Sequence, residues 1–245
     1  MKKINVLIPA AGKGSRSGLS IPKSLQEING IPIIIKICNQ LNNYDNNPKI
    51  IINQKDELLF LAAFKKYNIN AKLIYQNTPL GMGHAILQAK GYINDGEEIL
   101  LVWSDIPLLQ KSTIDGLVHN HLKAKNIFSL ASYVCLNPYT LVKRINGKVV
   151  KLLETHKNTF LDKVTEGERD IGLFIFDKKI VFDLLEKDFK EYDNTSKDEF
   201  GFLSIVEKIS NSRLKIDAYP IANEKDILSF NTPEDLIKIL ASVDQ

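Results

Sequence analysis

The sequence predicts an α/β fold: a Rossmann-like, mixed and mostly parallel sheet with helices on both faces. Short apolar runs such as 6–8 and 99–103 are typical of strands that are buried on both faces. In the first half of the chain such runs alternate with helical patterns, which indicates a parallel sheet. The second half contains further apolar runs and an Asn146-Gly147 turn. We therefore also expect a small β-rich extension that includes a hairpin.

The first half reads as alternating strands and helices. Pro32 fits near the start of the first long helix, since a proline there loses no helical hydrogen bond. The Asn-rich cluster over 42–48 predicts the turn that follows this helix. We expect strands over 6–8, 49–53, 72–75 and 98–103, and helices over 30–41, 57–67 and 83–90.

The second half is richer in strands. Asn146-Gly147 lies between the short segments 144–145 and 148–150, which is a strong hairpin signal. The last helix has Thr232 as its expected N-cap and Pro233 at its first position. We expect strands over 128–134, 149–153, 173–176 and 214–219, and helices over 179–185, 202–209 and 233–243.

Composition indicates one globular domain. The chain has 245 residues, 44% of them apolar and 25% charged, which is an ordinary globular balance. This length is ample for a buried core. No linker, low-complexity tract or internal repeat stands out, so we expect residues 1–245 to form a single domain.

Charge and hydropathy argue against several classes of partner. The net charge is only +3, which does not favour a nucleic-acid partner. No apolar run approaches the roughly 20 residues of a membrane span, and the apolar run after Lys3 is too short for a secretion signal. Cys38 and Cys135 match no metal-binding spacing, so we expect reduced, buried thiols. These features predict a cytoplasmic protein.

A loop of small residues follows the first strand. Little side-chain bulk lets backbone N–H groups approach an anion closely. The loop also has cationic side chains, Lys13 and Arg16, and a third, Lys23, follows soon after. Strand, small loop and cations together predict a phosphate-binding site, whose small residues are Ala10, Ala11, Gly12, Gly14 and Ser15.

Two familiar phosphate-loop patterns do not fit this loop. The dinucleotide fingerprint G-x-G-x-x-G fails because Ser17 stands where its third glycine belongs. The ATPase P-loop fails because Ser15, and not lysine, follows Gly14. An ordinary glycine turn after a first strand remains the alternative.

Asp105 and Asn231 are candidate metal ligands. Asp105 follows the strand over 98–103, and Asn231 comes just before the last helix. Mg²⁺ usually takes one or two protein oxygens together with phosphate oxygens, so these two residues could share one ion. The alternatives are a turn aspartate before Pro107 and an asparagine that caps the helix.

A second loop of small residues covers 75–85 and leads into a predicted helix. Gly81 and Gly83 would let the backbone pass close to a flat ligand, and the Gln76 amide can donate and accept hydrogen bonds. These properties suit recognition of the edge of a pyrimidine base. A plain loop with a glycine at the helix end is the alternative.

The histidines show no catalytic pattern. His84 is expected to make a hydrogen bond in the loop, and no histidine lies near a serine or cysteine in a nucleophilic-triad arrangement. His119 and His121 are two positions apart, so we expect them on different faces of a helix and exposed to solvent.

Seven motifs together carry a resemblance to a known family. They run in family order over nearly the whole chain: AAGKGSR and PK (10–23), LGMGHA (80–85), SDIPL (104–108), NGKVVKLLE (146–154), ERDIG (168–172), DEF (198–200) and FN (230–231). The chain resembles the sugar-phosphate nucleotidyltransferases, above all the uridylyltransferase domain of N-acetylglucosamine-1-phosphate uridylyltransferase.

The resemblance implies roles for individual residues. It implies catalytic roles for Arg16, Lys23 and Asp105, with Mg²⁺ bound by Asp105 and Asn231. It implies nucleotide contacts by Ala10, Ala11, Gly12, Gly14, Ser15, Gln76, Gly81 and Met82. On the acceptor side it implies Glu154 as the residue that holds the sugar, together with Thr140, Asp170 and Phe200.

The departures from the family pattern lie mainly on the acceptor side. Asp170 stands where the family has an asparagine, and Thr140-Leu141 replaces the family's glycine-arginine pair. Phe200-Gly201 replaces two tyrosines, and Ser104 replaces the glycine before the metal aspartate. A site built from polar groups discriminates strongly against a mismatched substrate. The acceptor need not be N-acetylglucosamine 1-phosphate.

The activity implied is transfer of a nucleotidyl group from an NTP, UTP favoured, to a sugar 1-phosphate or similar phosphorylated acceptor. The alternative is a cytidylyltransferase that joins CTP to a polyol or other non-sugar phosphate, because such enzymes share the P-A-A-G start seen at Pro9. A nucleotide sensor without catalysis and a dinucleotide-dependent dehydrogenase are more distant rivals. The oligomeric state stays open, with a homodimer as one option. Residues 1–110 would mainly bind the nucleotide, 111–230 the acceptor, and 231–245 would add the metal asparagine and closing helix.

Overall fold

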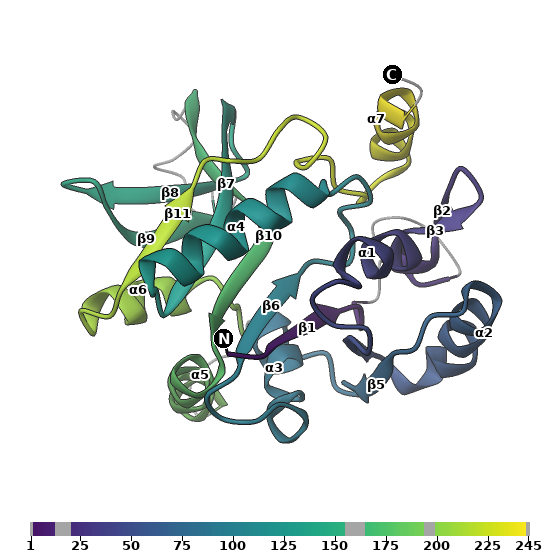
Figure 1. Ribbon diagram of the computed structural model, residues 1–245, viewed down its shortest axis with the longest axis horizontal. Helices are drawn as coiled ribbons and strands as arrows, with labels where there is room; N and C mark the ends of the chain where they lie inside the picture. Colours follow the sequence, from purple (N-terminus) through teal and green to yellow (C-terminus); the bar gives the residue numbers. More distant parts are fainter. Residues whose placement is uncertain (1, 13–20, 155–164, 194–198, 244–245) are drawn as a thin grey trace.

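The computed structural model describes residues 2–12, 21–154, 165–193 and 199–243. Its centre is a seven-stranded sheet in the order β11-β7-β10-β6-β1-β4-β5 (Figure 1). Within this sheet β10 alone runs antiparallel to its neighbours, β6 and β7. The strands are β1 (Ile4–Pro9), β4 (Lys49–Ile52), β5 (Lys72–Tyr75), β6 (Glu98–Val102), β7 (Phe128–Leu136), β10 (Glu166–Asp177) and β11 (Ile216–Tyr219). The predicted mixed, mostly parallel sheet is confirmed.

Helices cover both faces of this sheet because side chains alternate along each buried strand. In β4, for example, Ile50 and Ile52 belong to one buried cluster and Ile51 to the other. The first cluster includes residues of α1 (Ile33–Leu41), α2 (Glu57–Tyr67), α4 (Lys111–Ala124) and α7 (Pro233–Val243). The second includes residues of α3 (Met82–Leu87), α5 (Lys178–Asp193) and α6 (Ile205–Asn211). Short 3₁₀ helices are η2 (Lys23–Leu25), η3 (Gln54–Asp56) and η4 (Lys90–Tyr92).

Two small sheets stand apart from the main one. One pairs β2 (Glu27–Ile28) with β3 (Ile31–Pro32), and the other pairs β8 (Thr140–Ile145) with β9 (Lys148–Glu154). The β8–β9 turn has Asn146 at φ 50° and Gly147 at φ 76°. A tight two-residue hairpin turn needs positive φ at both positions, so the predicted Asn-Gly hairpin is confirmed.

The longest strands extend beyond the predicted apolar runs. β10 begins at Glu166, seven residues before the predicted start at Leu173, and β7 continues to Leu136. The added residues of both strands are mostly polar or partly exposed, so a search for apolar runs stops too early. These outer halves pair with each other, Glu166 with Leu136.

His121 corrects an expectation. The side chain is buried, at 1% exposed, although we expected it in solvent. It lies on the inner side of α4, with Nδ1 3.0 Å from Ser129 Oγ and Nε2 3.4 Å from Glu98 Oε2. His119 is exposed as expected. The i, i+2 spacing correctly separates their faces, but it does not say which face meets the sheet.

Two further expectations can be compared with the structure. Among the described residues, no helix combines the length and apolar character needed to cross a bilayer. Both cysteines are free thiols, and Cys38 is buried as expected. Cys135 is partly exposed, because it lies in the outer half of β7.

Candidate functional site

The candidate site lies beyond the carboxyl ends of β1, β5 and β6, where ligands of open α/β sheets usually bind. Ala10 and Ala11 follow β1 and are buried, and Ala10 N donates to Ile51 O at 2.6 Å. Gly12 is exposed, and a Cβ at this position would meet no atom within 4 Å among the described residues. Gly14, Ser15 and Arg16 fall within 13–20, which lies outside the described residues.

Lys23 stands between the two candidate metal ligands. Its Nζ donates to Asn231 Oδ1 at 2.8 Å and to Phe230 O at 3.3 Å, and it lies 3.7 Å from Asp105 Oδ2. The backbone adds a direct link, since Phe230 N donates to Asp105 O at 2.7 Å. Three residues spread over most of the chain therefore meet around one ammonium group.

Local structure holds Lys23 in this position. It opens η2, directly after the buried Pro22, whose φ is −52°. Ser24 and Leu25 on its other side are also buried. With both flanks buried, the Lys23 side chain, 22% exposed, is directed toward Asp105 and Asn231.

The Asp105 carboxyl group has a perturbed environment. Its side chain is 23% exposed, and burial raises its pKa above the ordinary value of an aspartate. The positive charge of Lys23, and to a smaller extent that of Arg169, acts in the opposite direction. Arg169 thus also contributes positive potential at this edge of the sheet.

The predicted helix cap at Thr232 is present. Asp235 N donates to Thr232 Oγ1 at 3.3 Å, and the Asp235 carboxylate accepts from the backbone N–H of Asn231 and Thr232 at 2.9 Å each. These bonds satisfy backbone donors at the start of α7. The Asn231 side chain is thereby left to reach Lys23.

Gln76 and Gly81 lie together after β5. Gln76 is 6% exposed, and its Nε2 donates to Gly81 O at 3.0 Å and lies 3.0 Å from His84 Nδ1. A carbonyl only accepts, so the Gly81 contact identifies the side of the amide that carries the hydrogens. Gln76 Nε2 therefore faces the Gly81 carbonyl, and Oε1 is the acceptor atom of the same amide. Met82 follows Gly81 as the first residue of α3.

Phe200 is a buried support for this loop. Phe200 N donates to Leu80 O at 2.8 Å, and Phe200 O accepts from Gly83 N at 2.9 Å. A Cβ on Gly81, which has φ 104°, would lie 2.5 Å from Phe200 O, and one on Gly83 would lie 2.5 Å from the Phe200 ring. The ring is 5% exposed and packs against Phe189 and Tyr192. Both loop glycines are therefore required sterically, and the Phe200 side chain is a buried part of the second hydrophobic cluster.

Thr140 contacts two other predicted acceptor residues, Asp170 and Glu154. Thr140 and Glu154 are Cα partners at the open end of the β8–β9 hairpin. Thr140 Oγ1 donates to Asp170 Oδ2 at 2.5 Å, and Gly172 N donates to Asp170 Oδ1 at 2.9 Å. Thr140 is 3% exposed and Asp170 5%. Two departures from the family pattern, 30 residues apart, are thus hydrogen-bonded to each other.

Sequence reasoning missed Asp226. This carboxylate is fully buried and accepts from Gln110 N at 2.6 Å, Thr113 Oγ1 at 2.7 Å and Asn223 N at 2.9 Å. It ties the segment before Asn231 to the start of α4, shortly after Asp105. No motif surrounds Asp226, so nothing in the local sequence indicates this role.

The chain is similar to a known protein family and to several known proteins. The family described as "MobA-like NTP transferase domain" matches residues 6–167. Similar proteins include two described as "Bifunctional protein GlmU". The one from Thermodesulfovibrio yellowstonii is 31% identical over 240 residues, 95% of this chain and 50% of that protein. The one from Fervidobacterium nodosum is 32% identical over 187 residues, 75% of this chain and 40% of that protein. The chain spans about half the length of these curated relatives.

Solved structures share the fold at low sequence identity. A putative glucose-1-phosphate thymidylyltransferase from Bacillus anthracis superposes with a TM-score of 0.73 at 16% identity, covering 98% of this chain and 94% of that one. The inositol-1-phosphate CTP transferase from T. maritima superposes with a TM-score of 0.69 at 13% identity, covering 100% and 97%. The resemblance to sugar-phosphate nucleotidyltransferases is confirmed: this chain belongs to the MobA-like NTP transferase domain family.

Proposed function

We propose that this enzyme joins an NTP, with UTP as the first candidate, to the phosphate of a sugar 1-phosphate or a similar small acceptor. The observation that carries the proposal is the meeting of Lys23, Asp105 and Asn231 at the carboxyl edge of the sheet. The Gln76 loop follows β5 at one side of this edge, and the Asp170 end of β10 lies at the other.

The reaction needs positioning and charge neutralisation more than covalent chemistry by the protein. An acceptor phosphate oxygen forms a bond to the α-phosphorus of the NTP, the bond from that phosphorus to the bridging oxygen breaks, and pyrophosphate leaves. The acceptor phosphate is already ionised near neutral pH, so no side-chain base is required. Lys23 would neutralise triphosphate charge. Arg16 is proposed to do the same, although it lies outside the described residues.

The oxygen atoms near Lys23 fit a bound Mg²⁺. Asp105 supplies a carboxylate oxygen and Asn231 an amide oxygen, which are the hard donors that Mg²⁺ prefers. Both already face one cation, the ammonium group of Lys23. When bound, Mg²⁺ would neutralise negative charge on the reacting phosphates. Asp105 and Asn231 would hold it, and Lys23 would then pair with phosphate oxygens.

The Gln76 amide supports recognition of a base through its carbonyl oxygen. Uracil offers N3–H to this acceptor, while cytosine offers its amino group, so Oε1 alone does not separate UTP from CTP. We place UTP first because the LGMGHA and SDIPL motifs resemble those of uridylyltransferases. CTP with a polyol phosphate is the second candidate, supported by the fold shared with a CTP transferase.

Gln76→Glu is expected to raise the KM for the NTP about tenfold and to change the acceptor KM little. The variant loses the two amide hydrogens and places a carboxylate oxygen against the Gly81 carbonyl, which disturbs the loop by roughly the value of a hydrogen bond. Asn77→Asp is the matched control, because Asn77 is exposed and bonds to Gln54. Equal KM values for the NTP in wild type and Gln76→Glu would count against the base assignment.

Asp170→Asn is expected to change acceptor preference. Each Asp170 oxygen accepts one hydrogen bond from the protein, so the remaining lone pairs favour acceptors that offer hydroxyl groups. The asparagine cannot match this pattern at both atoms. We expect the kcat/KM ratio of hexose 1-phosphate over N-acetylhexosamine 1-phosphate to fall about tenfold, with the NTP KM unchanged. A ratio that stays the same would remove Asp170 from acceptor selection.

The proposed function is tested by screening the purified protein. The four NTPs with Mg²⁺ are compared by thermal shift, since a ligand that binds the native state raises its melting temperature. The preferred NTP is then combined with sugar and polyol phosphates, and pyrophosphate release is measured. We expect UTP with a sugar 1-phosphate to release pyrophosphate. Nucleotide binding without release for any acceptor would favour a sensor, and turnover with CTP and a polyol phosphate would favour the second candidate.

A further inference from the structure

The β8–β9 hairpin carries Thr140 and Glu154, but among the described residues its two strands pair only with each other and form a sheet of their own. Val142, Val149 and Leu152 attach it to the core through buried apolar contacts. Apolar contact is not directional, so it fixes the hairpin's distance from the main sheet better than its exact position. The placement of Thr140 and Glu154 therefore depends on directional contacts.

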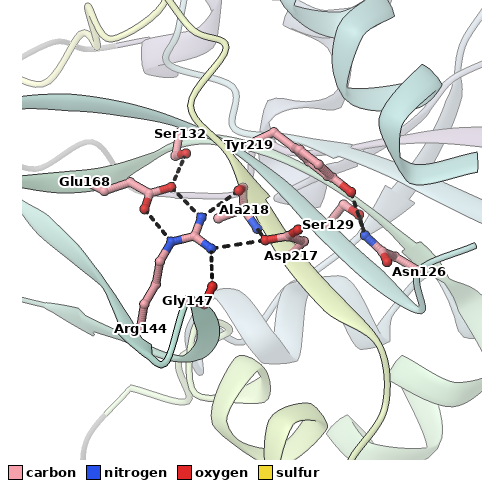
Figure 2. Close-up of polar contacts among 9 residues, drawn as sticks. All are labelled: Asn126, Ser129, Ser132, Arg144, Gly147, Glu168, Asp217, Ala218 and Tyr219. Carbon is pink, nitrogen blue, oxygen red and sulfur yellow. Dashed lines mark hydrogen bonds and ion pairs between the residues drawn. The ribbon is translucent and has the colours of Figure 1, made fainter. Parts of the chain in front are cut away.

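Arg144 in β8 supplies these contacts (Figure 2). Its Nε and Nη2 donate to Glu168 Oε2 and Oε1 at 2.8 and 3.0 Å, a bidentate pair with β10. Nη2 also donates to Ala218 O at 2.6 Å, and Nη1 donates to Asp217 Oδ1 at 3.1 Å, both in β11. Nη1 donates once more to Gly147 O at 3.0 Å. A guanidinium has five N–H donors, and each one here has an acceptor.

This arrangement is partly buried and charged. The side chains of Arg144 and Glu168 are 27% and 15% exposed. The hydrogen bonds with Glu168 raise the pKa of Arg144 above its ordinary value, with Asp217 adding to the effect and burial opposing it. Glu168 Oε1 also accepts from Ser132 Oγ in β7 at 2.6 Å. A bidentate, half-buried pair within a network holds geometry better than an isolated surface ion pair.

The Arg144 contact and the Thr140 contact fall on neighbouring positions of β10. Arg144 bonds to Glu168, and Thr140 bonds to Asp170, two residues further along the strand. The hairpin is thus fastened to β10 at two points. Arg144 is the point that also reaches β11, and Thr140 is the point next to Glu154.

We propose that Arg144 is a positioning residue for the acceptor substrate. It fixes the hairpin so that Glu154 and Thr140 meet the acceptor at the correct place relative to Lys23 and Asp105. This inference rests on the proposed function, which places Glu154 in the acceptor site. It assigns no contact between Arg144 and a substrate, because all its donors are used within the protein.

Arg144→Lys tests the proposal. Lysine keeps the charge but cannot reproduce the bidentate contact or reach β10 and β11 together. We expect the KM for the acceptor to rise about tenfold, with the NTP KM and the calorimetric NTP Kd within twofold of wild type. Glu168→Gln, which weakens the same link, is expected to give the same pattern. The acceptor KM of the double variant is expected to be no higher than that of the more impaired single variant, since both changes break one link.

Lys143→Met is the control for charge, because Lys143 is the exposed neighbour of Arg144 in β8 and its replacement removes a positive charge that Arg144→Lys keeps. All KM values are expected to stay at wild-type level. If Arg144→Lys leaves the acceptor KM within twofold, or raises both KM values equally, the positioning role is wrong while nucleotidyl transfer stands. If wild-type enzyme releases no pyrophosphate with any acceptor, the proposed function fails, and this inference fails with it.

Discussion

Lys23→Ala is expected to lower kcat by about 10²–10³-fold while the protein folds normally. The size follows from the loss of one preorganised charge that faces developing negative charge. In the structure the Lys23 ammonium group already contacts oxygens of Asn231, Phe230 and Asp105. With a triphosphate bound, the same group would neutralise phosphate oxygens. Pyrophosphate release under saturating substrates measures the effect, and far-UV circular dichroism and melting temperature report folding.

Two variants sharpen this prediction. Lys65→Ala removes an exposed lysine from α2 and is expected to keep wild-type kcat. Lys23→Arg keeps the charge but presents a planar fork in place of a compact ammonium, so we expect partial activity. If Lys23→Ala retained more than a third of wild-type kcat, Lys23 would not be a catalytic cation, and the contacts with Asn231 and Asp105 would be structural.

Local patterns in the sequence predict a large part of the fold. The strands β1, β4 and β6 are mainly apolar runs that are buried on both faces, and such runs depend little on their neighbours. The β8–β9 turn is likewise predictable, because Asn146 and Gly147 suit positive φ. The α7 helix begins at Pro233, as its cap signal indicates. Each of these features is determined by residues close in sequence.

Contacts between side chains on different strands cannot be predicted from local sequence, because they depend on the order of the strands in the sheet. β10 inserts between β6 and β7, and no periodicity in the sequence indicates this order. The Thr140–Asp170 bond and the Arg144–Glu168 pair both follow from that insertion. Motif resemblance identifies Thr140 and Asp170 as separate departures, but only the fold shows that they form one pair.

The candidate site likewise combines residues that the sequence identifies and contacts that only the fold reveals. Resemblance names Lys23, Asp105 and Asn231 one by one, and the structure brings them to one place. Asp226 carries no motif, yet its three hydrogen bonds tie the segment before Asn231 to α4. A residue whose role is to hold other residues is recognised by its partners, which are far away in sequence.

Asp105→Asn is expected to lower kcat by about 10²–10³-fold, as much as the loss of Lys23. The amide keeps the shape of the side chain but removes the charge that attracts Mg²⁺ in the proposed site. Asn231→Ala removes a neutral ligand, so we expect a smaller loss in kcat, about tenfold, together with a higher Mg²⁺ concentration for half-maximal activity. Asp183→Asn is the control, because Asp183 is exposed on α5 and pairs with Lys179.

A Mg²⁺ titration of pyrophosphate release separates the two possible roles of Asp105. If Asp105 only balanced the charge of Lys23, Asn231→Ala would leave the Mg²⁺ requirement unchanged, and Asp105→Asn would mainly alter the melting temperature. A shifted Mg²⁺ requirement in Asn231→Ala, with near-complete loss of turnover in Asp105→Asn, is the result that a shared metal site requires.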